Sequence, residues 1–269
     1  FRSHLDGSSH RFTPEFVVEI QRFLGSDVMM VLDECTPYPC SFEYAKTSAE
    51  LTARWAERCR RHSARHGPLY GHEQALFGIV QGSVYSELRE KSARELVSLG
   101  FDGYAIGGLA VGEPVDEMYA MVDVCEPLLP REKPRYLMGV GMPENLLEAV
   151  ERGMDMFDCV LPTRNGRNGM VFTKNGTMNL RNSAFRTDFS PVDTECFCYT
   201  CNTFTRAYLR HLFQSKEILA LQLATLHNLS FYSRLMAEAR KAIVEQRFDT
   251  WKQDVLMHLQ QSSDLGVHS

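Results

Sequence analysis

The sequence predicts an α/β protein built around a parallel β-sheet, and two of its patterns carry this prediction. Short apolar runs that end in glycine or in a polar residue recur between residues 27 and 162. Longer amphipathic stretches separate these runs, and this alternation is typical of strand–helix units whose strands lie parallel and buried. The predicted strands are Asp27–Asp33, Ala75–Gly82, Gly103–Leu109, Arg135–Gly141 and Met156–Pro162.

The stretches before and between these strands have the apolar periodicity of helices. The last two carry a proline near the first helical turn, where its missing N–H is tolerated. A closed (β/α)8 barrel needs eight such units, so the five visible here fit either an open sheet or a barrel whose first three strands lie upstream of Phe1. The predicted helices are Pro14–Leu24, Ser48–His66, Ser86–Leu99, Val115–Leu128 and Pro143–Arg152.

Composition and charge exclude several classes of protein. The 269 residues are 44% hydrophobic and 23% charged, unlike disordered or collagenous chains. No apolar run approaches the ~20 residues of a membrane span, and no signal peptide is visible. We therefore expect a cytoplasmic protein, and a chain that begins in mid-sequence. The net charge is −5, but the segment from Cys159 to Lys216 has eight lysines and arginines against three acids, a local +5. This asymmetry indicates a phosphate-bearing ligand or, alternatively, a solvated basic face.

A cysteine cluster predicts a metal centre. Cys196, Cys198 and Cys201 form a C-x-C-x-x-C motif, and His227 follows in a predicted helix. Three thiolates and one imidazole complete a tetrahedral shell, as a structural Zn²⁺ site requires. Three packed thiols are the alternative, His211 is a second possible histidine ligand, and an iron–sulfur cluster would usually need a fourth cysteine.

The chain changes character around this cluster. After Pro162, Gly/Asn turns surround short strand-like runs such as Met170–Thr173, and from Thr203 onward the pattern is helical. The expected helices here are Arg206–Phe213, Ile218–Arg234 and Met236–Glu245, with a frayed tail after Leu259. We expect three parts: the C-terminal part of a barrel over residues 1–162, a zinc-binding insertion over residues 163–228, and closing helices with a tail over residues 229–269.

Polar residues stand where the predicted strands end, and this edge carries the chemistry in parallel α/β folds. Asp158 lies in an apolar frame, where an unpaired carboxylate is costly, so we interpret it as a nucleophile or as a salt-bridged side chain. Asp33 can accept two hydrogen bonds side by side, as guanine would donate them, or can pair with a buried cation. Gln81 can donate and accept, and Gly107–Gly108 permits close approach of backbone N–H groups to a planar ligand.

Taken together, these motifs resemble the queuine tRNA-ribosyltransferase (tRNA-guanine transglycosylase) family over nearly the whole chain. The resemblance rests on Ser3–Ser8, Asp33–Pro39, Phe77–Gly82, Ile106–Glu113, the Asp158 segment with Thr163–Arg167, and the Cys/His set. It implies a (β/α)8 TIM barrel with a zinc-binding insertion near the last strand, the visible strands being the fourth to the eighth.

The resemblance also implies an activity: exchange of the wobble guanine of tRNAs with GUN anticodons for a 7-deazaguanine, in queuosine biosynthesis. Asp158 would attack the ribose and form a covalent ribosyl-enzyme, as in a retaining glycosidase. The implied base-binding residues are Asp33, Gln81, Gly107, Gly108, Leu109 and Met138. The implied RNA-binding residues are Gly139, Val140, Gly141, Met142, Pro143, Glu144, Asn145, Thr163, Arg164, Asn165, Gly166 and Arg167.

Three further expectations follow from the resemblance. Ala110–Val111 is similar to the bacterial form, which favours the precursor preQ1 over queuine as the incoming base, and the bacterial form suggests a homodimer. The family has a Ser-Gly-Gly-Phe-Gln-like segment with a general acid/base before it. Neither has a match here, since Asp6 is not that residue, so we expect a fragment.

The alternatives are a non-catalytic, zinc-containing tRNA-binding subunit of the same family and a barrel glycosidase that acts on free sugars.

Overall fold

The computed structural model describes residues 1–260 and contains two compact units. Unit 1 comprises residues 1–140 and 152–158, and unit 2 comprises residues 141–151 and the chain from residue 159 onward. The three-part division at residues 162 and 228 stays a prediction, and most of the expected tail after Leu259 lies outside the described residues. No helix in the described part of the chain is long and apolar enough to cross a membrane.

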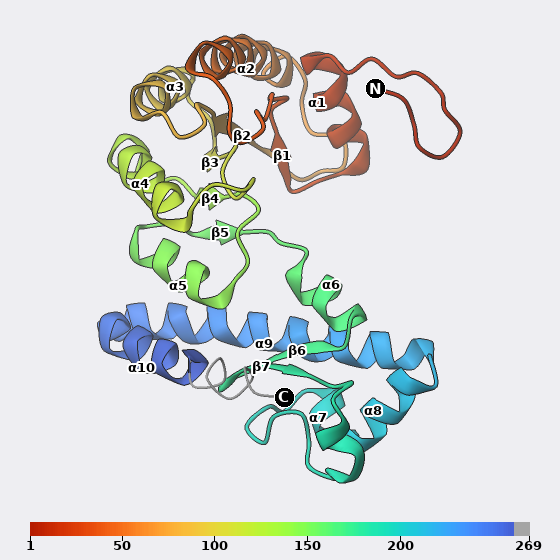
Figure 1. The fold of residues 1–269 in the computed structure, drawn as a ribbon. Helices are drawn as coiled ribbons and strands as arrows, with labels where there is room; N and C mark the ends of the chain where they lie inside the picture. Colours follow the sequence, from red (N-terminus) through yellow and green to blue (C-terminus); the bar gives the residue numbers. More distant parts are fainter. Residues whose placement is uncertain (261–269) are drawn as a thin grey trace. The chain divides into compact units, whose positions relative to one another are not determined.

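Unit 1 is built on a curled, five-stranded parallel sheet with the order β1-β2-β3-β4-β5 (Figure 1). Every neighbouring pair is consecutive in the chain and parallel, with Val28 opposite Ala75 and Leu137 opposite Phe157 at the two ends of the sheet. This arrangement confirms the predicted α/β class and corresponds to part of a (β/α)8 barrel. The strands are β1 (Val28–Met30), β2 (Ala75–Val80), β3 (Gly103–Ile106), β4 (Arg135–Leu137) and β5 (Met156–Phe157).

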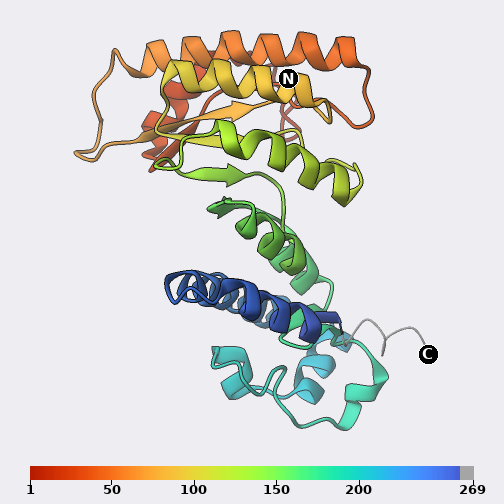
Figure 2. The same cartoon turned by 90° about the vertical axis from the view of Figure 1, so that its left-hand side faces the viewer.

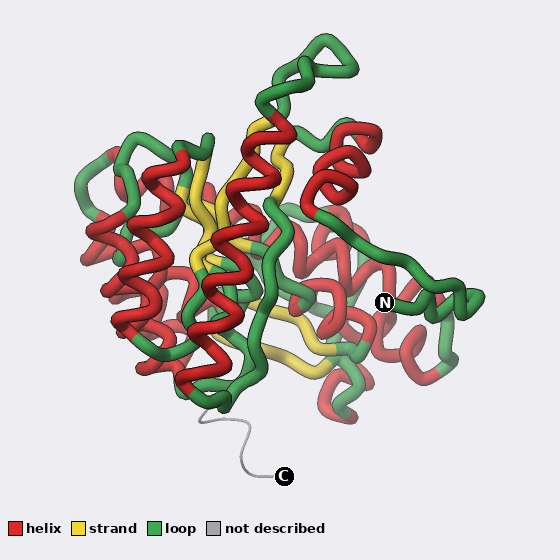
Figure 3. The backbone as a smooth tube through the Cα atoms, turned by 90° about the horizontal axis from the view of Figure 1, so that it is seen from above, coloured by secondary structure: helices red, strands yellow, loops and turns green. Residues whose placement is uncertain are grey.

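Helices connect the strands of unit 1 and lie beside the sheet (Figure 3). Local signals fix their ends: Thr13 caps α1 through a bond from Phe16 N, and Gly25 ends α1 in the left-handed conformation. Ser41 caps α2 in the same way, so this helix begins six residues before the predicted Ser48. The helices are α1 (Pro14–Leu24), α2 (Phe42–Ser63), α3 (Ser86–Leu99) and α4 (Val115–Cys125), and α4 continues as the 3-10 turn η1 (Glu126–Leu128).

The observed strands are shorter than the predicted ones, and glycines explain two of the early ends. Gly108 and Gly139 have φ values of 63° and 78°, and these left-handed conformations end the extended backbone. The prediction Met156–Pro162 was wrong beyond Phe157, because Pro162 lies in the first turn of a helix, where proline is favoured. The predicted polar residues therefore lie just after the strands, in the loops at their carboxyl ends.

Unit 2 combines helices with a small antiparallel hairpin. The hairpin joins β6 (Met170–Thr173) to β7 (Gly176–Asn179), which confirms the short strand predicted at Met170–Thr173. The long helix α9 (Ile218–Val244) packs beside α10 (Phe248–Gln260), as Figure 2 also shows. The other helices are α5 (Pro143–Glu151), α6 (Leu161–Arg167), the 3-10 turn η2 (Ser183–Thr187), α7 (Tyr199–Thr203) and α8 (Arg206–Gln214).

Two predictions for unit 2 need correction. The stretches Ile218–Arg234 and Met236–Glu245 are one continuous helix, because Leu235 is buried and continues the apolar face. The segment Thr163–Arg167, for which the sequence predicts no helix, belongs to α6. A buried core of Val171, Leu180, Val192, Leu209 and Leu223 joins the hairpin to α8 and α9, and Cys196 and Cys201 are part of it.

Candidate active site and metal centre

The carboxyl ends of the five strands in unit 1 bring the predicted site residues to one edge of the sheet. Asp33 follows β1, Gln81 follows β2, Gly107 follows β3, Met138 follows β4 and Asp158 follows β5. Parallel pairing places these ends side by side, and bonds from Gly107 N to Val80 O (3.0 Å) and from Met138 N to Ile106 O (3.3 Å) extend the ladder. The edge therefore presents two carboxylates and one carboxamide from three different strands.

Asp33 and Gln81 form a buried polar pair. Gln81 Nε2 donates to Asp33 Oδ2 at 2.7 Å, and the glutamine is only 1% exposed. Burial raises the pKa of Asp33, and the hydrogen bond from Gln81 opposes this effect. The alternative interpretation, an ion pair with a buried cation, is not supported, since no lysine or arginine within residues 1–260 pairs with Asp33.

The second amide atom of Gln81 is buried without a partner. Its Oε1 accepts no hydrogen bond in the described structure, and a buried unsatisfied acceptor is costly. A ligand N–H group at this edge would satisfy it. The pair therefore offers an acceptor carboxylate and an acceptor amide oxygen close together, which suits the N–H-rich edge of a purine such as guanine.

Gly107 and Gly108 are required by close packing against this pair. A Cβ atom on Gly107 would lie 2.6 Å from Ile79 Cγ2 and 3.6 Å from the sulfur of Met138, and one on Gly108 would lie 2.3 Å from Gln81 Oε1. Gly108 also has a left-handed φ that disfavours side chains. The backbone of Gly107 and Gly108 therefore lies directly against the side chains of Ile79 and Gln81. Leu109 is only 4% exposed and anchors the segment in the core.

Asp158 is held through one of its two carboxylate oxygens. Tyr136 Oη donates to Oδ1 at 2.7 Å, and Gly139 N donates to the same oxygen at 2.9 Å. The carboxylate itself is exposed, and neither donor occupies Oδ2. Burial and the neighbouring carboxylate raise the pKa of Tyr136, so the tyrosine stays a donor at neutral pH. An accessible carboxylate fixed in one orientation has the geometry of a nucleophile.

Sequence reasoning missed two residues that shape this edge. Tyr136 stands two positions before Met138, and the period-two alternation of a strand could have placed both on one face. Glu113 lies in the motif Ile106–Glu113, and its carboxylate accepts hydrogen bonds from the backbone N–H groups of Ala110 and Val111. Glu113 therefore holds the loop that follows Gly108 and Leu109.

The predicted RNA-binding residues fall in two segments. Gly139 and Val140 belong to unit 1, where Gly139 contacts Asp158, and residues 141–145 belong to unit 2. There Gly141 O accepts from Tyr232 Oη at 2.6 Å, and Pro143 begins α5. The second segment, residues 163–167, forms most of α6.

Basic side chains surround an open cavity at the end of α6. Arg167, Arg181 and Lys216 line this cavity of about 440 Å³, together with Phe213 and the acid Glu217. The guanidinium of Arg181 lies 5.2 Å from the ring of Phe213, which orients it. Arg167 and Lys216 form no ion pair with any residue of the described chain. The cavity therefore concentrates positive charge that the protein itself leaves largely uncompensated.

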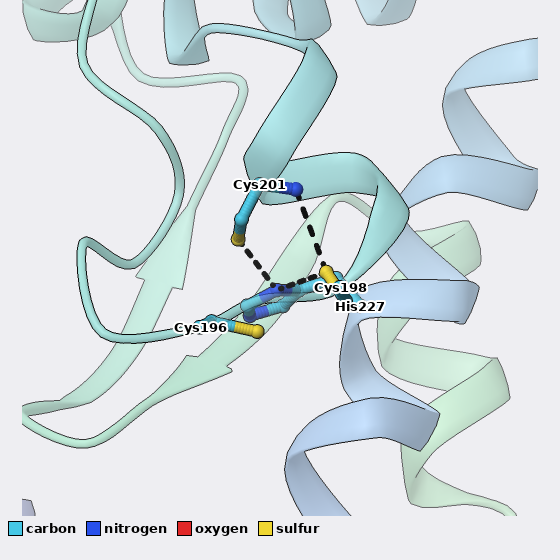
Figure 4. Close-up of side chains that lie close together, drawn as sticks. All are labelled: Cys196, Cys198, Cys201 and His227. Atoms are coloured by element: carbon cyan, nitrogen blue, oxygen red, sulfur yellow. Dashed lines mark hydrogen bonds between the residues drawn. The ribbon is translucent and has the colours of Figure 1, made fainter.

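The four predicted metal ligands converge in unit 2 (Figure 4). Their ligand atoms all lie within 4.8 Å of one another, with Cys196 and Cys201 buried and His227 fully buried. His227 Nδ1 is 3.3 Å from Cys201 Sγ and 3.6 Å from Cys198 Sγ. A tetrahedral Zn²⁺ site separates sulfur from nitrogen by about 3.6 Å, so these residues fit the ion. His211 is exposed and lies outside the cluster.

Neighbouring groups orient the histidine of this cluster and shift the pKa values of its ligands. His227 Nε2 lies 2.7 Å from Phe172 O, which fixes the ring so that Nδ1 faces the thiols. Hydrogen bonds from Cys201 and His227 lower the pKa of Cys198 to about 3, against the effect of burial. Burial alone would lower the pKa of His227, but its contacts with Cys196 and Cys198 raise it to about 9. Negative charge is therefore favoured on Cys198, whereas the hydrogen bond with Cys198 raises the pKa of Cys201, whose thiol would lose its proton only to a bound metal ion.

Comparison with known proteins agrees with this arrangement. A family profile described as "Queuine tRNA-ribosyltransferase" matches residues 1–261. The chain belongs to this family. It is 54% identical over 256 residues to the queuine tRNA-ribosyltransferase of Desulforamulus reducens. The matched region covers 95% of this chain and 68% of that protein.

Two further relatives with the same name show the same extent of similarity. The protein of Caldanaerobacter subterraneus is 56% identical, with 95% of this chain and 67% of the relative covered. The protein of Pelotomaculum thermopropionicum is 54% identical, with 97% and 69% covered. The chain thus spans about two thirds of the length of these queuine tRNA-ribosyltransferases.

Proposed function

We propose that the protein is a pentosyltransferase of queuosine biosynthesis that replaces the wobble guanine of tRNA with a 7-deazaguanine. Family membership supports the reaction class. The reaction requires a group that binds the base and a group that attacks the ribose, and the strand-end residues offer both. Asp33 and Gln81 can bind a purine edge, and Asp158 can attack the ribose. A tRNA-modifying reaction of this kind would take place in the cytoplasm.

The proposed reaction consists of two displacements at C1′ of the ribose. In the first, a carboxylate oxygen of Asp158 forms a bond to C1′, the C1′–N9 bond breaks, and its electron pair leaves with guanine, which takes up a proton. In the second, the incoming base loses its N9 proton, N9 forms the new bond to C1′, and Asp158 departs as a carboxylate. Both steps pass through an oxocarbenium-like transition state, as in retaining glycoside hydrolysis with a base in place of water.

The target nucleotide must leave its stack before Asp158 can reach it. Anticodon-loop bases are comparatively free to do so, and the flipped base would enter the polar edge beside Gln81. Asp33 would accept from the ring N–H and the exocyclic amine, Gly108 N–H would donate to the base oxygen, and Met138 would cover the base face. We propose preQ1 as the incoming base, because Ala110–Val111 is similar to the bacterial form of the family, in which a side chain at Val111 would narrow the space that queuine needs.

The single observation that supports this proposal best is the held, accessible carboxylate of Asp158 at the edge that also carries the Asp33–Gln81 pair. The test is incorporation of labelled guanine into tRNA with a guanine at the wobble position, with the same tRNA carrying adenine there as the control. We expect incorporation in the first tRNA alone. Binding of both tRNAs without incorporation would favour the non-catalytic alternative.

Asp33 gives the exchange a predicted pH dependence. The ionised carboxylate accepts two N–H groups, and its protonation removes that capacity. Because burial raises its pKa, guanine affinity should fall on acidification at a pH above 3.8, the ordinary value of an aspartate. Asp33→Asn should weaken guanine binding by about 100-fold, the loss of two charge-assisted hydrogen bonds, and abolish this pH dependence.

Calorimetric titration of guanine over a range of pH checks this prediction. Asp27→Asn, which changes an exposed carboxylate of the same unit, should behave as the wild type. The melting temperature of Asp33→Asn should be unchanged or higher, because a buried carboxylate is costly to keep ionised. Equal acid sensitivity in the wild type and Asp33→Asn would refute the role of Asp33.

We further propose that the tRNA backbone binds at α6 and its neighbouring cavity. Arg167, Arg181 and Lys216 converge there from three segments of unit 2, a pattern suited to phosphate groups. Arg164 lies on the same helix and is exposed. The loop of residues 139–145 would add contacts near the reacting nucleotide.

Loss of one phosphate contact should be visible in the salt dependence of binding. Arg167→Ala should reduce the slope of log affinity for tRNA against log salt by about 0.7–0.9. Arg186→Ala is the matched control, because Arg186 is an exposed arginine of the same unit that does not line the cavity. An unchanged slope for Arg167→Ala, or the same change for Arg186→Ala, would contradict the proposed contact.

We propose that the metal is Zn²⁺ with a structural role. Cys196, Cys198, Cys201 and His227 would supply all four ligands and leave no position for a reacting water. When bound, the ion would supply cross-links between α7, the preceding loop and α9. Homodimer formation is a further proposal, supported by exposed aromatic rings of unit 2 such as Tyr199 and Tyr208, and light scattering would test it.

A further inference from the structure

Arg89 is a buried arginine that contacts the carboxyl ends of strands β2 and β3. It lies on α3, its side chain has no exposed surface, and it forms four hydrogen bonds with backbone carbonyl groups. Its Nη1 donates to Gly107 O at 2.6 Å and to Val80 O at 3.0 Å, Nε donates to Ser83 O at 2.7 Å, and Nη2 donates to Gly108 O at 3.2 Å. One guanidinium thus joins the carboxyl ends of β2 and β3.

This cation has no counter-ion among residues 1–260. No carboxylate of the described chain forms an ion pair with Arg89, and its positive charge is balanced by carbonyl dipoles instead. Burial lowers the pKa of Arg89, yet arginine remains protonated in proteins. A buried charge without a partner is expensive, and an apolar side chain could fill the same space. The cost suggests that the charge itself has a use at this position.

Two of the four bonded carbonyl groups, those of Gly107 and Gly108, belong to the peptides that we propose to face the base. Gly107 O and Gly108 N–H are the two ends of one planar peptide, and Gly108 O and Leu109 N–H are the ends of the next. A cation that pulls electron density toward Gly107 O makes the N–H at the other end a stronger donor, because hydrogen-bonded groups polarise one another. The shortest of the four bonds, 2.6 Å, is the one to Gly107 O.

We propose that Arg89 is a positioning residue that fixes and polarises the Gly107–Gly108 peptide, so that Gly108 N–H binds the 6-oxygen of the purine more strongly. The inference rests on the proposed function, since it concerns how that site holds guanine. The same polarisation would stabilise negative charge on the purine as the C1′–N9 bond breaks, because the donor is fixed in advance and needs no reorganisation.

The test compares two purines in calorimetric titrations of the 269-residue chain. Guanine carries the 6-oxygen, and 2-aminopurine lacks it. Arg89→Gln should weaken guanine binding by about tenfold and leave 2-aminopurine affinity within about twofold, since only the hydrogen bond from Gly108 N–H to the 6-oxygen is weakened. Arg89→Lys keeps the charge and should retain most of the preference for guanine. The two purines also differ in the groups that they present to Asp33. This difference is the same in the wild type and in every variant, so it cancels when the affinity ratios of the variants are compared.

A purely structural role gives a different result. Arg135→Gln is the matched control, because Arg135 is 5% exposed and binds Glu126 and Leu129 O rather than the Gly107 peptide. It should leave the guanine preference unchanged. If Arg89→Gln does not fold, Arg89→Lys alone decides: an equal loss of both purines in either Arg89 variant would overturn the inference. Failure of the wild type to bind guanine would contradict the proposed function itself, and this inference with it.

Discussion

Asp158→Asn should abolish guanine exchange and leave the fold and the affinities for guanine and tRNA intact. Asparagine has the shape of aspartate and can still accept from Tyr136 and Gly139, so the local structure should persist. It carries no negative charge and is a poor nucleophile, so the first displacement at C1′ should slow by more than about 1000-fold. Labelled guanine incorporation into tRNA, measured for both chains side by side, checks this expectation.

The control for this variant is Asp116→Asn, which neutralises an exposed acid in the first turn of α4 in the same unit. Its incorporation rate should equal that of the unchanged chain. Guanine and tRNA affinities of Asp158→Asn should lie within a few-fold of the wild type, since the carboxylate acts on the ribose rather than on the base edge. Exchange at an undiminished rate in Asp158→Asn would refute the nucleophile assignment.

The second large effect concerns the metal centre. A chelator that removes the ion should lower the melting temperature of unit 2 sharply, because four ligands from two distant segments would lose their common bond. Cys198→Ser should have the same effect. Loss of an outer-shell partner already costs 10–100-fold in metal affinity, so loss of a thiolate ligand should cost more than about 100-fold. Metal analysis of the purified variants, combined with calorimetric melting, measures both quantities.

Two matched variants make this prediction specific. Cys35→Ser changes an exposed cysteine of unit 1, and His211→Ala changes the histidine that the sequence left as an alternative ligand. Both should retain one equivalent of zinc. Full zinc content in Cys198→Ser, or loss of zinc in His211→Ala, would contradict the ligand set.

Much of the fold could be predicted because its strands are buried and interrupted by clear helix signals. All five parallel strands and the four helices of unit 1 follow from apolar runs and periodicity, although Ser41 began α2 earlier than expected. The end of the last strand could not be placed, because Asp158 is the only charged residue in Phe157–Pro162 and apolar residues continue on both sides of it. Only the tertiary structure shows that Pro162 lies in the first turn of a helix.

The site shows the same limit in a different form. Asp33, Gln81 and Asp158 could be proposed as site residues because polar residues at strand ends are unusual in an apolar frame, and the structure places them at one edge of the sheet. Their partners could not be proposed in this way, because contacts such as Tyr136 with Asp158 join residues 22 positions apart. Arg89 was also missed, since an arginine on an amphipathic helix ordinarily faces solvent.

The most direct test of the account is the identity of the residue that becomes attached to RNA. The chain is mixed with tRNA that has guanine at the wobble position, resolved under denaturing conditions, and any protein–RNA adduct is mapped by mass spectrometry after nuclease digestion. We predict an adduct on Asp158 that disappears when free guanine is added, because the base reverses the first displacement. An adduct on another residue, or guanine exchange that persists without Asp158, would contradict the proposed mechanism.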